Sequence, residues 1–216
     1  MSGGKAIKYK GESVNVRWNG RLCIHIGECG RATGELFVGG RKPWCQPDLV
    51  SDAEVEDVVE RCPTGALTYE YEDASRKEQA SSLNMVHVAY NGPLYVRGDL
   101  AIEGADETAS GLAFRAALCR CGQSKNKPYC DNSHEGAGFT DYGAVGDAGT
   151  KLEETGGKLS VTPLQDGPLL VKGNATISSS SGRTAWQGNQ VALCRCGASE
   201  NKPFCDGKHA TVGFKS

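Results

Sequence analysis

The chain repeats itself beyond residue 82, and this limits that part of the fold to two copies of one small unit. Residues 92–98 (GPLYVRG) align with 167–173 (GPLLVKG), and the segment CRCG occurs at 119–122 and again at 194–197, at the same offset. Each copy is longer than a usual solenoid repeat, and two copies are too few for a solenoid. We therefore predict two duplicated units that face each other.

Each copy carries the same four side chains with metal-ligating chemistry. A Cys-x-Cys pair on an extended segment can offer two thiolates to one metal atom, and Cys and His four residues apart face the same way at the start of a helix. Asp131 and Asp206 stand where a helix N-cap would bind free amides ahead of the His. The predicted metal ligands are Cys119, Cys121, Cys130 and His134 in the first copy, and Cys194, Cys196, Cys205 and His209 in the second.

Spacing alone does not decide which metal these ligands hold. Three thiolates and one imidazole suit both a closed structural zinc site and a [2Fe–2S] cluster. The ten cysteines would also suit small disulfide-bonded domains. We expect reduced, metal-binding thiols in a cytoplasmic protein instead, because the first 20 residues lack the basic and apolar regions of a secretory signal.

Composition excludes two classes of function and indicates a fold class. No stretch approaches the roughly 20 apolar residues of a membrane helix, and a formal net charge of −2 excludes nucleic-acid binding through a general basic field. Only 38% of the residues are hydrophobic and 29 are glycines, which favours several small, turn-rich modules over one large core. We predict an α+β protein made of small β-rich modules with short helices.

Three modules are expected. They are an N-terminal module at 1–72, a first repeat at 83–142 and a second repeat at 158–216, joined by the polar segment 73–82 and a flexible, Gly-rich connection at 141–157.

Local patterns predict short strands in both repeats and one helix in the N-terminal module. In that helix, Ser51 and Glu54 form a capping box, and Val55, Val58 and Val59 lie on one face before it ends near Arg61. The predicted strands are 85–90, 94–96 and 113–118 in the first repeat, and 159–162, 169–171 and 190–193 in the second.

The ligand segments resemble the CDGSH iron–sulfur motif of mitoNEET-type proteins, C-x-C-x2-(S/T)-x3-P-x-C-D-G-(S/A/T)-H. Residues 121–134 (CGQSKNKPYCDNSH) and 196–209 (CGASENKPFCDGKH) match it at nearly every position. The first copy departs at Asn132, where the family has Gly, and we expect Asn132 to adopt a glycine-like left-handed conformation. The second departs at Lys208, which places a charge beside His209 where the family has a small residue.

The resemblance implies a [2Fe–2S] cluster in each repeat, with an inner iron on the Cys-x-Cys pair and an outer iron on the later Cys and His. Family members with one motif form dimers, so two motifs in one chain imply an intramolecular pseudo-dimer with a shared β layer around Gly92 and Gly167. Lys127 and Lys202 are candidates for modulating the charge at each cluster.

Histidine ligation makes the expected clusters sensitive to acid. Imidazole must be neutral to bind iron and its free pKa is about 6.5, so the clusters should loosen as the pH falls toward and below that value, and their reduction should take up protons. The variant with both His134→Cys and His209→Cys should retain its visible absorbance in mild acid. Equal loss of absorbance from the variant and the natural protein would refute this role.

The N-terminal module carries four further cysteines. Residues 23–29 (CIHIGEC) are similar to a ferredoxin cluster loop, with Ile26 where the middle Cys would stand. Residues 62–67 (CPTGAL) are similar to the C-P-x-G-A ending of such a site. The region around 7–70 thus resembles the divergent single-cluster ferredoxin domain that accompanies some CDGSH proteins.

This resemblance implies Cys23, Cys29 and Cys62 as cluster ligands. Either His25 or Cys45 would be the fourth ligand of a [4Fe–4S] cluster, and a [3Fe–4S] cluster would need only the three cysteines. The competing interpretations are a module that has lost its cluster, a zinc site or a disulfide. Trp18 and Trp44 are expected to be core residues rather than electron conduits.

We predict an iron–sulfur protein that transfers electrons or clusters to a redox or cluster-acceptor protein, as a monomer with internal pseudo-twofold symmetry. The sequence shows no Ser/His/Asp arrangement, no G-x-G-x-x-G after a strand and no P-loop, so we expect no enzymatic activity. The alternatives are a zinc-binding interaction module without a redox role and an enzyme that uses the N-terminal cluster as a Lewis acid.

Overall fold

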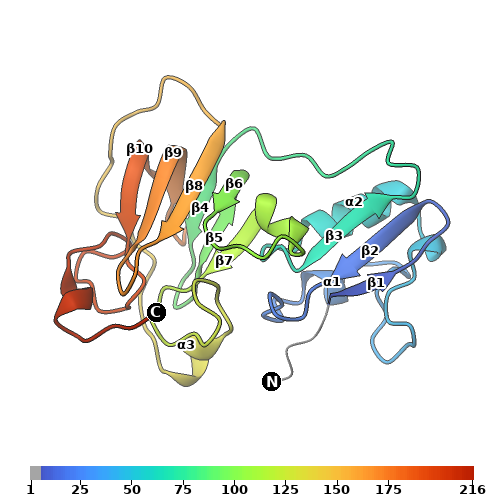
Figure 1. Ribbon diagram of the computed structural model, residues 1–216, viewed down its shortest axis with the longest axis horizontal. Coiled ribbons are helices and arrows are strands. Elements are labelled where there is room, and N and C mark those ends of the chain that lie inside the picture. Colours follow the sequence, from blue (N-terminus) through green and yellow to red (C-terminus); the bar gives the residue numbers. More distant parts are fainter. Residues whose placement is uncertain (1–5) are drawn as a thin grey trace.

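The computed structural model describes residues 6–216 as two β-sheets with a few short helices. Figure 1 shows the three strands of the N-terminal module on one side and the strands of both repeats on the other. The predicted combination of small β-rich modules with short helices is confirmed.

The N-terminal module is a three-stranded antiparallel sheet covered by one helix. Strands β1 (Ile7–Tyr9), β2 (Val14–Trp18) and β3 (Leu67–Tyr71) lie in the order β1-β2-β3. The other elements are α1 (Glu28–Arg31), the 3-10 helix η1 (Pro47–Leu49) and α2 (Asp52–Glu60).

Helix α2 begins and ends where its sequence predicts. The Ser51 hydroxyl accepts a hydrogen bond from the backbone amide of Glu54 at 3.3 Å, which satisfies one free amide of the first turn. Val55, Val58 and Val59 are buried against the sheet, because residues three and four apart share one helix face.

The two repeats share one seven-stranded sheet. The first contributes β4 (Met85–Val88), β5 (Leu94–Arg97), β6 (Asp99–Ile102) and β7 (Arg115–Leu118), with η2 (Ser110–Ala113) and α3 (Ser133–Gly136). The second contributes β8 (Lys158–Pro163), β9 (Leu169–Ser178), β10 (Thr184–Leu193) and η3 (Lys208–Ala210). The strand order is β6-β8-β9-β4-β5-β7, with β10 beside β9.

The predicted repeat strands are present, but their extents differ. Strand β4 ends at Val88 instead of residue 90, and β9 continues from Leu169 to Ser178, beyond the predicted 169–171. Residues 113 and 114 precede β7, because the chain forms the 3-10 turn η2 there. The segment 190–193 is only the end of β10, a ten-residue strand that pairs along β9.

The register of the strands follows the sequence repeat. Within each repeat, Met85 pairs with Arg97 and Ser160 with Lys172, which is the same pairing moved by one repeat offset. Between repeats, β4 runs parallel to β9 with Met85 opposite Thr176, and β6 runs parallel to β8 with Ala101 opposite Ser160. Adding the repeat offset to residue 85 gives 160, and subtracting it from residue 176 gives 101. The two parallel pairings are therefore equivalent. Each repeat therefore completes the sheet of the other through equivalent strands.

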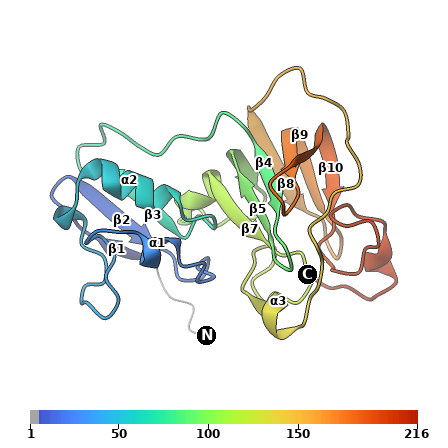
Figure 2. The same ribbon diagram turned by 180° about the vertical axis from the view of Figure 1, so that it is seen from behind.

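The two connections between modules, at 73–82 and 141–157, make more contacts with the rest of the protein than their composition predicts. Seen from behind in Figure 2, both arch over the sheets without a helix or extended strand. In the connection at 141–157, however, Val145 is buried in the core of the repeats, and the amide of Thr150 donates to the carbonyl of Gln187 at 2.8 Å. In the segment 73–82, Glu78 is buried. The prediction of a flexible connection at 141–157 is wrong, because backbone groups and one apolar side chain attach it to the sheet.

Candidate metal sites

The four predicted donors of the first repeat come together as two pairs. The Sγ atoms of Cys119 and Cys121 are 3.8 Å apart, and Cys130 Sγ is 3.5 Å from His134 Nδ1. Two sulfur ligands of one tetrahedral metal, with bonds of about 2.3 Å, lie about 3.8 Å apart. Each pair therefore has the spacing needed to hold one metal atom.

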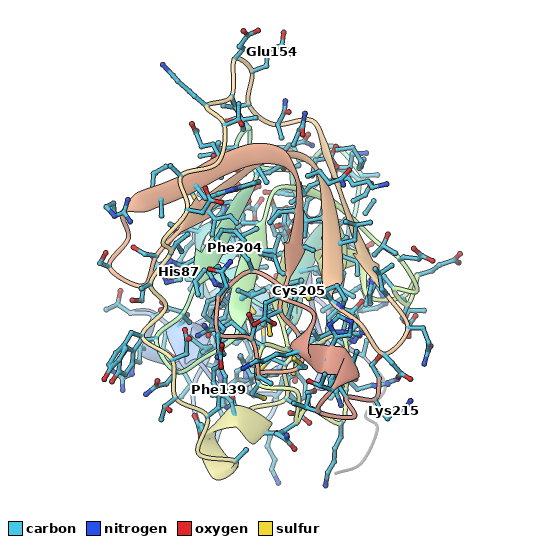
Figure 3. The ribbon with its side chains drawn as sticks, turned by 90° about the vertical axis from the view of Figure 1, so that its left-hand side faces the viewer. His87, Phe139, Glu154, Phe204, Cys205 and Lys215 are labelled. Carbon is cyan, nitrogen blue, oxygen red and sulfur yellow. The ribbon has the colours of Figure 1, made fainter. Side chains whose placement is uncertain are left out.

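The second repeat reproduces this geometry. Cys194 Sγ and Cys196 Sγ are 3.7 Å apart, and Cys205 Sγ lies 3.4 Å from His209 Nδ1. Figure 3 shows Cys205 near the centre of the face formed by the repeat loops, whereas Lys215 and Glu154 lie at its periphery. Because the same donor distances occur in both repeats, the spacing follows from the repeated ligand sequence.

Short backbone bonds hold the ligand loops closed. Where β7 ends, the amide of Cys119 donates to the carbonyl of Pro128 at 2.8 Å, and in the second repeat Cys194 donates to Pro203 at the same distance. The hydroxyl of Ser124 accepts from the amide of Asn126 at 3.0 Å. These bonds place the third cysteine of each repeat, Cys130 or Cys205, beside the Cys-x-Cys segment.

Asp131, which follows the third cysteine of the first repeat, binds a free amide ahead of His134 as predicted, but from one residue before the helix cap. Helix α3 has Asn132 as its N-cap. The Asp131 carboxylate accepts from the amides of Lys125 at 2.8 Å and Ser133 at 3.0 Å, which joins both ends of the ligand loop. Asp206 does the same for Glu200 and Lys208.

The expected left-handed conformation of Asn132 is confirmed. Its φ is 69°, and Gly207 at the same place in the second repeat has φ 89°. Asparagine is among the few residues other than glycine that adopt this region readily. The departure from the motif therefore preserves the backbone path between Cys130 and His134.

Backbone amides point at the candidate ligand sulfurs. Gln123 donates to Cys121 Sγ at 3.4 Å, and Asn132 donates to Cys130 Sγ at 3.4 Å. Burial raises the pKa of Cys130 to about 11, while the Asn132 amide acts in the opposite direction. Burial that disfavours a bare thiolate, combined with amides aimed at the sulfur, suits a thiolate bound to a metal cation.

An arginine between the first two cysteines of each repeat supports the site, and sequence reasoning assigned it no role. Arg120 is buried and donates through Nε to the carbonyl of Gly92 at 2.9 Å. Arg195 is buried and donates to the carbonyl of Gly167 at 3.0 Å. Both tie the Cys-x-Cys loop to the preceding hairpin turn. The signal that could have found them is a charged residue retained at the same place in both copies.

The two lysines proposed to modulate the clusters are held by their own loops. Lys127 Nζ donates to the carbonyl of Ser124 at 2.8 Å, and Lys202 Nζ donates to the carbonyl of Ser199. Lys127 Nζ also lies 5.7 Å from the ring centroid of Phe214, in the other repeat. A role in setting the charge at the clusters stays a prediction.

The Cys-x-Cys loops of the two repeats touch. A Cβ atom on Gly122 would lie 2.5 Å from the carbonyl oxygen of Cys196, and one on Gly197 would lie 2.7 Å from that of Cys121. Both glycines have positive φ, at 79° and 82°. Only glycine fits this approach, and it brings the two candidate sites to one interface.

The three predicted ligands of the N-terminal module line one cavity of about 530 Å³. Cys23, Cys29 and Cys62 face it together with His25, whose Nδ1 is 4.0 Å from Cys23 Sγ. His25 has φ 54°, a left-handed conformation that is uncommon among residues other than glycine. Burial raises the pKa of Cys29, and the negative charges of Cys62 and Cys23 would raise it further.

Cys45 lies outside this cavity. Its side chain is 1% exposed and packs in the core of the N-terminal module, where burial raises its pKa to about 12. Trp18 and Trp44 pack against the same core, as expected, and also line the cavity.

None of the ten cysteines forms a disulfide bond. Across residues 6–216, no three His, Cys, Asp or Glu side chains converge in the way that a single metal ion requires. Within the same described residues, no helix is both long and apolar enough to cross a membrane.

Comparisons with known proteins agree with this arrangement. Residues 9–72 match a family described as a divergent 4Fe-4S mono-cluster domain. Residues 91–135 and 166–210 match a family described as an iron-binding zinc finger of the CDGSH type.

Two relatives match the N-terminal region. They are the uncharacterized protein YjdI of Escherichia coli K12 and of Escherichia coli O157:H7, each 46% identical over 63 residues, which cover 29% of this chain and 83% of YjdI. No solved structure matches the chain significantly. The chain is thus an iron–sulfur protein that belongs to the same family as YjdI through its N-terminal region, where it also matches a divergent 4Fe-4S mono-cluster domain, and it carries two CDGSH iron-binding units after that region.

Proposed function

We propose that this protein transfers electrons and binds one [2Fe–2S] cluster in each repeat. The observation that carries the proposal is the pairing of donors at the spacing of one tetrahedral metal, twice in each repeat. A [2Fe–2S] cluster needs four protein ligands in two pairs. Replacement of Cys by His on one iron raises the reduction potential.

The proposed roles follow from the resemblance to the CDGSH motif. Cys119 and Cys121, which are both buried, would hold an inner iron, and the buried Cys194 with the partly exposed Cys196 would do so in the second repeat. His134 and His209 are half-buried, so the outer iron would be nearer to solvent and to a partner protein. The chemistry that the clusters supply is one-electron transfer, and the chain's own residues position them and exclude water.

We also propose that the repeats form an intramolecular pseudo-dimer. Two features support it: the equivalent parallel pairings of β4 with β9 and of β6 with β8, and the reciprocal approach of Gly122 and Gly197 to the opposite Cys-x-Cys loop.

For the N-terminal module we propose a [4Fe–4S] cluster bound by Cys23, Cys29, Cys62 and His25. The cavity that these four residues line supports His25 as the fourth ligand, while the placement of Cys45 in the core argues against that residue. The partner would be a redox protein, and we propose no bond-making catalysis.

Anaerobic purification, with iron and sulfide counted per chain, tests the proposal. We expect about eight iron atoms, two from each repeat and four from the N-terminal module, and a colour that bleaches with dithionite. A count of about four would leave the N-terminal module without its cluster. A colourless protein with zinc as its only metal would overturn the redox function.

A further inference from the structure

The loop that carries Cys23 is docked on the outer ligand loop of the first repeat. The side-chain amide of Asn132 donates to the carbonyl of Ile24 at 2.7 Å, and that of Asn126 donates to the carbonyl of Arg21 at 2.8 Å. Ile24 itself is 3% exposed and packs in one cluster with Ala117 and Cys130. A residue between two N-terminal ligands is therefore packed in the same small cluster as a ligand of the first repeat.

The N-terminal site lies at the interface between the modules. Cys23 and Cys62 both pack against the core of the repeats. Beside Cys62, the backbones of Gly65 and Gly111 come so close that a Cβ on Gly111 would lie 2.2 Å from the carbonyl oxygen of Gly65. Such backbone contact leaves no room for the modules to slide past each other.

Covalent and hydrogen bonds form a continuous path between the two candidate sites. Cys130 Sγ accepts from the backbone amide of Asn132 at 3.4 Å, and the Asn132 side chain donates to the carbonyl of Ile24. Ile24 is bonded to Cys23. Asn132, the residue that departs from the motif, thus connects a ligand of one site to the neighbour of a ligand of the other.

The second repeat differs at the same positions. Gly207 replaces Asn132 and has no side chain, and the space where its Cβ would lie is open. Asn201, at the position equivalent to Asn126, is exposed. Cys205 is partly exposed, whereas Cys130 is buried. The outer ligand loop of the second repeat is consequently the freer of the two.

We infer that the N-terminal site and the first CDGSH site form an internal electron-transfer pair, with Ile24 and Asn132 as its positioning residues, and that the second repeat faces the external partner. This inference rests on the proposed electron-transfer function. An electron leaving the N-terminal site oxidises it and reduces the first CDGSH site, any proton taken up on reduction comes from water, and no bond between heavy atoms is made or broken. The electron comes from a one-electron donor, which is dithionite in the experiment below.

The first test measures proximity by electron paramagnetic resonance on the full chain with all clusters reduced. The N-terminal signal should be split by spin coupling to a neighbouring cluster. The splitting should disappear in Cys130→Ala, which removes the first cluster, and persist in the matched variant Cys205→Ala, which removes the second. Iron counts on both variants establish that the N-terminal cluster is retained. Loss of the splitting in Cys205→Ala alone, or no splitting in the natural protein, would overturn the inference.

The second test addresses the path and does not remove a ligand. Asn132→Gly keeps the left-handed backbone but deletes the bond to Ile24, and Gly207→Asn adds the same side chain to the second repeat. After a substoichiometric pulse of reductant, electron redistribution between the N-terminal and first CDGSH signals should slow in Asn132→Gly and stay unchanged in Gly207→Asn. Unchanged redistribution in Asn132→Gly and in Ile24→Ala would overturn the roles of these residues.

These outcomes distinguish a failure of the proposed electron-transfer function from a failure of the internal electron-transfer pair. Clusters that are present but take up no electron from dithionite would refute the proposed electron-transfer function. Clusters that are reduced normally, without coupling between the N-terminal and first sites, would refute only the internal pair.

Discussion

Replacing Arg115 by methionine should lower the free energy of unfolding by about 3–5 kcal/mol, because it removes one partner of a buried ion pair. The Arg115 side chain is 2% exposed and lies 2.7 Å from the carboxylate of Glu78. It also donates to the carbonyls of Val59 at 2.6 Å and Leu67 at 3.2 Å. A residue of strand β7 thereby binds helix α2, strand β3 and the connection between the modules.

The destabilisation should grow with pH, which distinguishes a buried charge from lost packing. Burial raises the pKa of Glu78 from 4.5 to about 7, and Arg115 acts against that rise. The folded state thus binds the Glu78 proton more tightly than the unfolded state even with Arg115 present. Removal of Arg115 should raise this pKa further, so stability should fall more steeply in the variant than in the natural protein as the pH rises from about 5 to 8. Urea denaturation at several pH values measures the effect.

Position 190 offers a matched control for Arg115. Gln190 is the equivalent residue of the second repeat and is exposed, so Gln190→Met should change stability by no more than about 0.5 kcal/mol. The double variant Arg115→Met with Glu78→Gln should recover part of the loss, because no unpaired charge remains buried. Equal stability of Arg115→Met and Gln190→Met would show that the ion pair does not hold the modules together.

Replacing Gly122 by alanine should destabilise the protein by about 2–5 kcal/mol, from the sum of two costs. A left-handed residue with a side chain costs about 1–2 kcal/mol, and overpacking against a fixed neighbour costs about 1–3 kcal/mol. The new methyl would lie 2.5 Å from the backbone oxygen of Cys196, which cannot rotate away. We expect the same substitution to weaken cluster binding in both repeats, as measured by iron content after dialysis.

Gly104→Ala separates these costs. Gly104 has φ 75°, and a Cβ there would meet no atom within 4 Å, so only the backbone cost applies. Thermal denaturation should rank the natural protein above Gly104→Ala, and Gly104→Ala above Gly122→Ala. If the two variants unfold together and keep equal amounts of iron, contact between the Cys-x-Cys loops does not support the clusters.

Sequence reasoning located the parts of this molecule that depend on local pattern. The Ser51 cap of helix α2, the hairpins that begin each repeat and the glycine-like Asn132 were predicted because each depends on residues close in the chain. The ligand pairs were also accessible, since a duplicated motif reports its own spacing.

The remaining features depend on contacts between distant segments. No local pattern shows that Arg115 meets Glu78, that Ile24 packs in one cluster with Cys130, or that Cys45 lies in a core rather than in the cavity. The connection at 141–157 was predicted to be flexible because composition does not reveal the single Val145 that attaches it to the core.

The covalent joining of two equivalent halves has an evolutionary consequence. In an assembly of identical subunits, a mutation is present in every copy, so the two metal centres stay alike. Here a substitution such as Asn132 alters one half and leaves its counterpart, Gly207, untouched. Fusion therefore permits specialisation: one metal centre can be committed to a neighbouring module of the same chain, while the equivalent centre stays accessible to other proteins.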